Sequence, residues 1–284
     1  MKSEDILLVG CGNMGGAMLK GWIDQGRAAA LTVIDPDPAK VPGTVRAFAA
    51  PDARITAPRA VVLAIKPQML VAAAPALEPL VAPGTILVSI LAAVPIAVLR
   101  RHFPRAGAIV RAVPNLPASI GAGITALVAD ALAPADRALI DALLAPLGPV
   151  EWLASEAMID AATSVSGCGP AFLFRFAAAA VEAGVAQGLD RDQATRLFAH
   201  TMIGAGQLLA QAEHSPADMA RRVASPGGVT LAGLAILDRD DALMRLVSET
   251  LAAAGRRSAE MAADSAQAGR DQPAQGSARP IASA

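Results

Sequence analysis

The first half of the chain alternates short apolar runs with stretches of helical spacing. The run "DILLVG" at 5–10 is apolar and ends in glycine, as expected for a strand buried on both faces of a sheet. Helical spacing then begins at Met14 and stops near Gly26. Six further runs have the strand pattern: 31–36, 60–65, 85–90, 108–113, 121–127 and 149–153. This alternation predicts a doubly wound, mostly parallel α/β sheet with helices on both faces.

After about residue 154 the strand pattern stops and helical spacing takes over. The expected helices are rich in alanine and leucine, with proline or aspartate near their starts, and they span 170–188, 190–213, 215–224 and 230–261. Residues 170–180 are apolar nearly all round, which is more than one small helical domain can bury. We therefore expect a homodimer formed through this domain, with a higher assembly of dimers left open.

Three segments are expected along the chain. Residues 1–153 form the α/β domain, and residues 154–263 form an all-α domain. The segment 264–284 is rich in alanine, serine, glutamine and proline without periodicity, so we expect a disordered tail.

Composition and charge narrow the classes of function. The chain has 284 residues, 54% of them hydrophobic, and a net charge of −1 without a basic run. We therefore expect a small-molecule ligand, and neither a nucleic acid nor a membrane as partner. The N-terminus is acidic where a secretory signal is basic, and no stretch of roughly 18 apolar residues is found, so we expect a cytoplasmic protein. Cys11 and Cys168 suit neither a disulfide framework nor a metal site, and no metal is expected.

A glycine motif follows the first expected strand and opens the first expected helix. Gly10, Gly12 and Gly15 have the GxGxxG spacing, which permits a tight turn, close approach of a pyrophosphate and close helix–strand packing. The helix N-terminus then favours the phosphates. Asp35 ends the second strand twenty residues beyond Gly15, where it would accept hydrogen bonds from the adenosine ribose. Because its carboxylate would repel a 2′-phosphate, this interpretation prefers NADH to NADPH.

Two stretches in the helical half place glycines before an expected helix start. They are "SVSGCGPAF" at 164–172 and "VASPGGVTLAGL" at 223–234. Each is expected to present unpaired main-chain amides, which would bind a carboxylate. Helix capping with tight helix packing is the alternative explanation for either stretch.

Five ordered segments together resemble the pyrroline-5-carboxylate reductase family. They are "GCGNMGGAML", "AIKPQ" at 64–68, "RAVPNLPA" at 111–118, "SVSGCGPAF" and "SPGGVTLAGL", and the resemblance covers about residues 5–262. It implies an N-terminal Rossmann domain and an intertwined helical dimerisation domain. It also implies reduction of 1-pyrroline-5-carboxylate to L-proline by NAD(P)H, the last step of proline biosynthesis.

The resemblance also assigns roles to residues. Thr230 would reach toward the ring nitrogen or the nicotinamide and is the candidate catalytic residue. The candidate dinucleotide contacts, besides Asp35, are Gly10, Cys11, Gly12, Asn13, Met14, Gly15, Ala64, Ile65, Lys66, Pro67 and Asn115. The candidate substrate contacts are Ala224, Ser225, Pro226, Gly227, Gly228 and Val229, with Gly167 and Gly169 from the other glycine stretch and Glu213. The chain departs from the family pattern at Leu91, Ala93, Leu116 and Cys168.

Other kinds of protein remain open. Short-chain dehydrogenases use a tyrosine, and this chain has none. Enzymes of the β-hydroxyacid dehydrogenase type place a lysine in the helical domain, and no lysine follows Lys66. A histidine-based dehydrogenase would have to use His200 or His214, two lone histidines of the kind that are more often structural. Another imine or ketimine reductase and a non-catalytic dinucleotide-sensing regulatory protein are the remaining alternatives.

Overall fold

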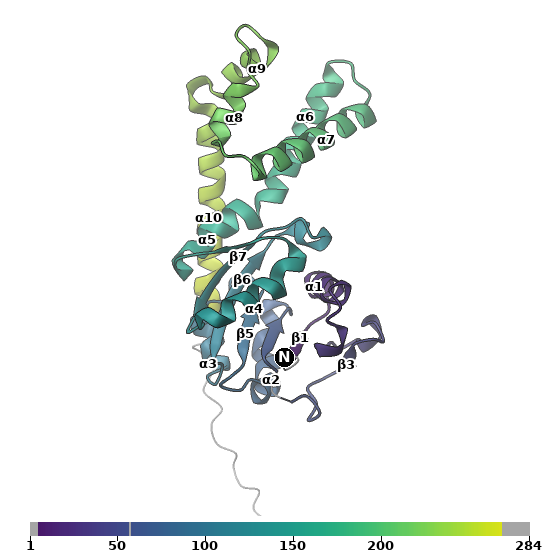
Figure 1. Cartoon of the computed structure of the whole chain (residues 1–284). Helices are drawn as coiled ribbons and strands as arrows, with labels where there is room; N and C mark the ends of the chain where they lie inside the picture. Colours follow the sequence, from purple (N-terminus) through teal and green to yellow (C-terminus); the bar gives the residue numbers. More distant parts are fainter. Residues whose placement is uncertain (1–4, 57, 269–284) are drawn as a thin grey trace, which may run out of the picture. The chain divides into compact units, whose positions relative to one another are not determined.

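A computed structural model describes residues 5–56 and 58–268, and Figure 1 labels its helices and strands. The chain divides into two compact units. The first runs to Gly167 and resumes at Gly255, and the second is Cys168–Ala254. Each unit is described by itself below.

The first unit is built on one eight-stranded sheet. Its strands are β1 (Ile6–Val9), β2 (Leu31–Ile34), β3 (Arg46–Phe48), β4 (Ala60–Leu63), β5 (Ile86–Ser89), β6 (Ala108–Pro114), β7 (Thr125–Asp130) and β8 (Val150–Trp152). Their order is β3-β2-β1-β4-β5-β6-β7-β8, and β6–β7 is the antiparallel pair of an otherwise parallel sheet. The predicted doubly wound, mostly parallel sheet is confirmed.

Helices cover both faces of this sheet, as its mostly apolar and buried central strands require. They are α1 (Asn13–Asp24), α2 (Leu70–Leu77), α3 (Ile96–His102) and α4 (Pro134–Leu144). One core cluster joins the sheet to α1 and α4, and there the buried Trp22 donates its indole N–H to the Leu143 carbonyl at 2.7 Å. A second cluster joins the sheet to α2 and α3 through Leu77, Leu99 and Phe103.

The second half of the chain is helical, as predicted. Its helices are α5 (Ile159–Ala162), α6 (Gly169–Ala186), α7 (Arg191–Ala210), α8 (Pro216–Arg222), α9 (Val229–Leu237) and α10 (Ala242–Ala268). A π-helical turn, Thr163–Gly167, joins α5 to α6. Asp190 begins α7 with a capping box that includes Gln193. Gly184 allows α6 to approach Ala194 of α7, since a Cβ there would lie 3.4 Å from the alanine methyl.

Several predicted element bounds are wrong. β3 was missed because it has three residues and begins with a charged one. The strand expected at 121–127 begins at Thr125, since Gly121 has a φ of 71° and ends the preceding turn. The helix expected at 230–261 is broken before α10, where Asp240 and Asp241 have φ values of 54° and 55°.

The domain bounds also differ from the compact units. Residues 154–167 were expected in the helical domain and cluster with the first unit, as does α10 from Gly255 onward. Helix α10 continues to Ala268, so 264–268 is helical and not part of a disordered tail. The rest of the expected tail, 269–284, lies outside the described residues.

One helical run in the described ranges has the length and composition of a membrane-spanning helix. It is Glu156–Ala186, whose most apolar 18-residue window has a mean hydropathy of 1.3. The expectation that no such stretch exists is therefore wrong. A helix that packs against other helices in a water-soluble protein can have the same composition, so the run is weak support for a membrane.

Candidate active site

The glycine motif forms a tight turn, and two of its three glycines leave no room for a Cβ atom. Gly10 follows β1 with a φ of 96°, and a Cβ there would lie 2.7 Å from the Ala64 carbonyl oxygen. A Cβ on Gly15 would lie 2.1 Å from the Gly10 carbonyl oxygen. Gly12 has no neighbour within 4 Å of such a position. The first and third glycines thus serve packing, and the open second position leaves room for a ligand.

The position of this turn fits the pyrophosphate of a dinucleotide. β1 lies between β2 and β4, so the chain winds in opposite directions from this strand. Ligands of doubly wound sheets bind at such a switch point, beyond the carboxyl ends of the strands. Gly12 is the N-cap of α1, and both Gly12 and Asn13, the first residue of the helix, are exposed. Free amides and the helix dipole at that place favour an anion.

The Asp35 carboxylate braces the glycine turn. Its Oδ2 accepts a hydrogen bond from the Cys11 main-chain N–H at 2.7 Å, and its Oδ1 accepts one from the Asp37 N–H at 2.9 Å. Each carboxylate oxygen keeps a second acceptor site for a ribose hydroxyl. The sequence suggested the ribose contact alone, because the approach of Asp35 to Cys11 depends on the pairing of β1 with β2.

The Cys11 thiol is held in its neutral form. Burial raises the pKa of Cys11, the negative charge of Asp35 raises it further, and Lys40 opposes both effects. A thiol of raised pKa is a poor nucleophile, so the interpretation of Cys11 as a small loop residue agrees with its surroundings.

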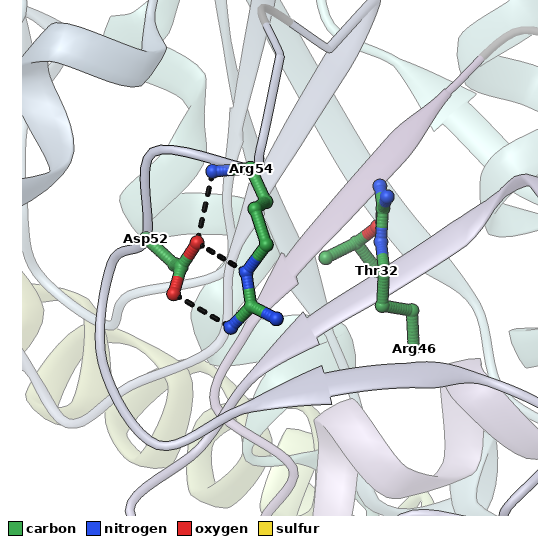
Figure 2. A network of polar contacts seen from close by, with 4 residues as sticks. All are labelled: Thr32, Arg46, Asp52 and Arg54. Atoms are coloured by element: carbon green, nitrogen blue, oxygen red, sulfur yellow. Dashed lines mark hydrogen bonds and ion pairs between the residues drawn. The ribbon is translucent and has the colours of Figure 1, made fainter.

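Two arginines flank β3: Arg46 begins the strand, and Arg54 lies beside Phe48, which ends it. The Asp35 N–H donates to the Phe48 carbonyl at 3.0 Å, and the Arg54 guanidinium lies 4.8 Å from the centre of the Phe48 ring. Arg54 Nε donates to Asp52 Oδ1 at 2.8 Å, and Figure 2 shows the contacts between these two side chains, with Arg46 lying beside Thr32. The sequence indicated Lys40 alone as a nearby cation.

Both of these arginines already have partners. Hydrogen bonds from Arg54 lower the pKa of Asp52 to about 2, so this pair stays ionised at neutral pH. Arg46 donates from Nε and Nη2 to the Thr32 hydroxyl, at 3.1 and 2.8 Å. A 2′-phosphate would therefore have to compete with Asp52 for Arg54.

The segment after β4 reaches the glycine turn. The Ala64 N–H donates to the Val9 carbonyl at 2.8 Å, and the Ala64 methyl would lie 3.2 Å from a Cβ on Gly15. Ile65 and Pro67 are half-buried next to it, and Lys66 is exposed. The structure thus brings residues 10–15, Asp35 and 64–67 together at the carboxyl edge of neighbouring strands.

Asn115 lies at the same edge of the sheet, after β6, with both ends of its amide bonded. Its Oδ1 accepts from the Ile124 N–H at 3.0 Å, and its Nδ2 donates to the Ser166 carbonyl at 3.2 Å. Among the family departures, Leu91 is buried in the core, while Leu116 is 60% exposed next to Asn115.

The second unit contains the "SPGGVT" turn between α8 and α9. Gly227 has a φ of 68°, and Gly228 is the N-cap of α9 and donates its N–H to the Ser225 carbonyl at 2.9 Å. Within the described ranges, no hydrogen bond uses the N–H of Val229, Thr230 or Leu231. Three free amides at the start of a nine-residue helix agree with the predicted anion site.

The other glycine stretch has a different structure from the one predicted. Gly167 closes the π turn, Gly169 begins α6, and the N–H groups of Ala171 and Phe172 both donate to the Cys168 carbonyl, at 3.0 and 3.4 Å. The expected loop is wrong, because residues 163–167 form a π turn, whereas the expected helix start with Pro170 in its first turn is confirmed. The first turn of α6 tolerates Pro170, and the chain ahead of it forms a π turn, which is wider than an α-helix.

The other candidate residues of the helical half lie at exposed positions. Glu213 and His214 lie in the turn between α7 and α8, and His200 lies on α7. In the part of the chain that the structure describes, no group of three or more metal-binding side chains is found.

An ion pair between a buried arginine and a half-buried glutamate was missed by the sequence reasoning. Arg111 on β6 is 4% exposed, and its Nη1 lies 2.9 Å from Glu156 Oε1. The signal was present as the single charged residue in the apolar strand "AIVRAV". Its partner lies 45 residues further on, too far for any local pattern.

A glycine turn at the switch point of a doubly wound sheet, braced by an acid and followed by helices, defines a dinucleotide-binding protein of the Rossmann class. The comparisons narrow this class. Residues 156–261 match the family described as pyrroline-5-carboxylate reductase dimerisation, and residues 5–93 match the family described as NADP oxidoreductase, coenzyme F420-dependent.

Individual relatives carry the same name. The chain is 37% identical over 274 residues to a pyrroline-5-carboxylate reductase of Pseudomonas aeruginosa, covering 92% of this chain and 98% of the relative. It is 32% identical over 243 residues to that of Escherichia coli, covering 83% and 90%. A solved pyrroline-5-carboxylate reductase of Coxiella burnetii superposes with a TM-score of 0.86 at 27% identity, covering 92% and 99%. The chain belongs to the pyrroline-5-carboxylate reductase family.

Proposed function

We propose that this chain reduces 1-pyrroline-5-carboxylate to L-proline with a nicotinamide dinucleotide as hydride donor, the last step of proline biosynthesis, in the cytoplasm. The observation that carries the proposal is the 37% identity, over nearly the full length, to a relative of that name. The braced glycine turn and the free amides of α9 support it, because they suit the two ligands of such a reaction.

The chemistry divides between the cofactor and the chain. When bound, the dinucleotide would supply the hydride for the carbon of the ring C=N, and the ring nitrogen takes one proton. The amides of Val229, Thr230 and Leu231 would hold the substrate carboxylate, and the Thr230 hydroxyl would bond the ring nitrogen. The imine nitrogen can take this proton from solvent, and the protonated imine is already electrophilic. The chain therefore needs to orient the reactants more than it needs a strong acid.

The first experiment tests turnover. The purified chain should oxidise NADH or NADPH when racemic 1-pyrroline-5-carboxylate is added, with one proline formed per dinucleotide. A dinucleotide-sensing regulatory protein would bind the cofactor without turnover. A different imine reductase would favour another imine by kcat/KM, and either result would reject the proposal.

Thr230 provides a test of the substrate side. We expect Thr230→Val to lower kcat/KM by about ten- to a hundredfold, because one hydrogen bond to a charged group contributes about 1.5–3 kcal/mol. Thr230→Ser should keep most of the activity, since it retains the hydroxyl. Thr195→Val, an exposed position on α7, is the matched control. Equal activity of Thr230→Val and Thr195→Val would remove Thr230 from the mechanism.

For the cofactor, we propose a slight preference for NADH over NADPH. The Asp35 carboxylate would bond the ribose hydroxyls and repel a 2′-phosphate, and the cations Arg54 and Lys40 already pair with Asp52 and Asp37. Asp35→Ser should raise the ratio of kcat/KM for NADPH to that for NADH. Initial rates with both dinucleotides measure this ratio, and an unchanged ratio would discard the assignment of Asp35.

For the assembly, we propose a homodimer formed through the helical unit. Large apolar side chains of α6, among them Leu173, Phe174 and Phe176, are more than half exposed in the single chain. Such a surface is typical of an interface. The match of residues 156–261 to a dimerisation family supports the same assembly.

A further inference from the structure

Arg111 is an unusual residue for the interior of a sheet. Its side chain is 5% exposed on a strand that is otherwise apolar, and within the described residues its buried Nε has no hydrogen-bond partner. Burying a charged side chain costs more free energy than burying an apolar side chain of similar size, so a contribution to stability explains Arg111 poorly. Its ion pair with Glu156 therefore suggests a role in fixing one specific arrangement.

Glu156 ties three parts of the first unit together. Its Oε1 accepts from Arg111 Nη1 at 2.9 Å and from the Ile96 N–H, at the start of α3, at 2.8 Å. Glu156 itself begins residues 156–167, which we call the connecting segment because they link the sheet to α6. One carboxylate oxygen thus holds the start of the connecting segment against both β6 and α3.

The end of the connecting segment is held by the same face of β6. Side chains two and four residues after Arg111 project to the same side of an extended chain, and these are Val113 and Asn115. Asn115 Nδ2 donates to the Ser166 carbonyl at 3.2 Å. A Cβ on Gly167 would lie 3.9 Å from Val113 Cγ1, so the segment packs on this valine.

Helix α10 holds the connecting segment from another side. The Ser258 hydroxyl donates to Asp160 Oδ1 at 2.7 Å, and a Cβ on Gly255 would lie 4.0 Å from Ser164 Oγ. The segment ends in the π turn, Thr163–Gly167. This geometry is rare and is often found at functional sites.

We propose that Arg111 and Asn115 are positioning residues of the reductase reaction, which act by holding the connecting segment in one conformation. For Asn115 this role replaces the dinucleotide contact that the family resemblance implies, because both ends of its amide are already bonded, to the Ile124 N–H and the Ser166 carbonyl. This inference rests on the proposed function. Gly167, the last residue of the segment, is one of the candidate substrate contacts, and it lies in the same compact unit as the proposed dinucleotide contacts. Hydride transfer requires the two reactants to be held in a narrow range of distances and angles, so a loose segment would slow catalysis without weakening dinucleotide binding.

Two variants with a matched control test the proposal. Arg111→Met removes the charge and keeps most of the volume. Asn115→Asp keeps the acceptor for the Ile124 N–H and removes the donor to Ser166. Arg105→Met is the control, because it removes an exposed arginine whose Nε pairs with Glu78 at 2.7 Å. Hydrogen exchange of residues 159–170 is measured alongside kcat and the KM for each substrate, at a temperature at which each variant is fully folded.

We expect exchange in this segment to rise about tenfold in both variants. We also expect kcat to fall by about ten- to a hundredfold, while the KM for the dinucleotide stays within about twofold. Exchange and kcat equal to those of Arg105→Met would overturn the proposal. A rise in dinucleotide KM that matches the fall in kcat for Asn115→Asp would overturn it for Asn115 and make this residue a cofactor contact.

The exchange measurement separates this inference from the proposed function. Faster exchange in variants of a chain without any reductase activity would mean that the segment is held as described but the proposed function is wrong. If Arg111→Met does not fold, the nearly isosteric Asn115→Asp carries the test. The double variant Arg111→Met with Glu156→Gln should lose no more activity than Arg111→Met alone, because both changes break one contact.

Discussion

Gly15→Ala should lower the free energy of unfolding of the apoprotein by more than about 4 kcal/mol, or prevent its accumulation as a folded protein. The added methyl would lie 2.1 Å from the Gly10 carbonyl oxygen. Relief by movement of Gly10 is blocked, because its N–H donates to the Ile34 carbonyl at 2.8 Å and Ala64 lies behind it. The loss is a large part of the total stability of a typical domain, about 5–15 kcal/mol. Urea unfolding without dinucleotide measures it.

Two neighbouring glycines are the controls for this prediction. At Gly16, inside α1, a Cβ would lie 3.9 Å from the Cys11 oxygen, so Gly16→Ala should stabilise the helix by up to about 1 kcal/mol. At Gly12 no atom lies within 4 Å, so Gly12→Ala should keep the stability and weaken dinucleotide binding. If Gly15→Ala is as stable as Gly16→Ala, the packing of α1 on β1 described above is wrong.

Removal of the carboxylate from the substrate should lower kcat/KM at least about a thousandfold. The amides of Val229, Thr230 and Leu231 would be left without a partner by 1-pyrroline, and polar sites built for a group reject analogues that lack it by large factors. Initial rates with 1-pyrroline and with 1-pyrroline-5-carboxylate at equal dinucleotide concentration give the ratio.

A main-chain substitution connects this ratio to the turn before α9. Val229 is the first residue of α9 and 92% exposed, and Gly228 before it has extended backbone angles that are compatible with a following proline. Val229→Pro therefore removes one amide donor and keeps the helix start. It should lower kcat/KM for 1-pyrroline-5-carboxylate about tenfold and leave the rate with 1-pyrroline unchanged. An equal loss for both imines would show that the carboxylate does not bind there.

Local patterns in the sequence predicted the parts of the site that lie within one strand–turn–helix unit. β1, the turn at Gly10 and the start of α1 follow from apolar runs and glycine spacing, and the structure confirms them. For Asp35, the local pattern predicted its position at the end of β2. Its hydrogen bond from the Cys11 N–H was missed, because that bond depends on the pairing of β1 with β2.

The features that sequence reasoning missed depend on contacts between distant segments. Arg111 and Glu156 are 45 residues apart in the sequence, and no local pattern around either residue predicts their contact. The stretch at 164–172 was interpreted as a loop, because glycine and proline usually interrupt helices. Packing of the connecting segment on β6 and α10 instead keeps the chain helical through the π turn.

The π turn at Thr163–Gly167 also limits how the length of this chain can vary. A π turn is an α-helix that has gained one residue, and an α-helix advances by about 100° per residue. Deleting a residue between Thr163 and Gly167 would restore the regular helix and rotate every later side chain of α6 by that angle about its axis. The large exposed side chains of α6, Leu173, Phe174 and Phe176, would then point in new directions, so insertions and deletions should be far more harmful here than substitutions.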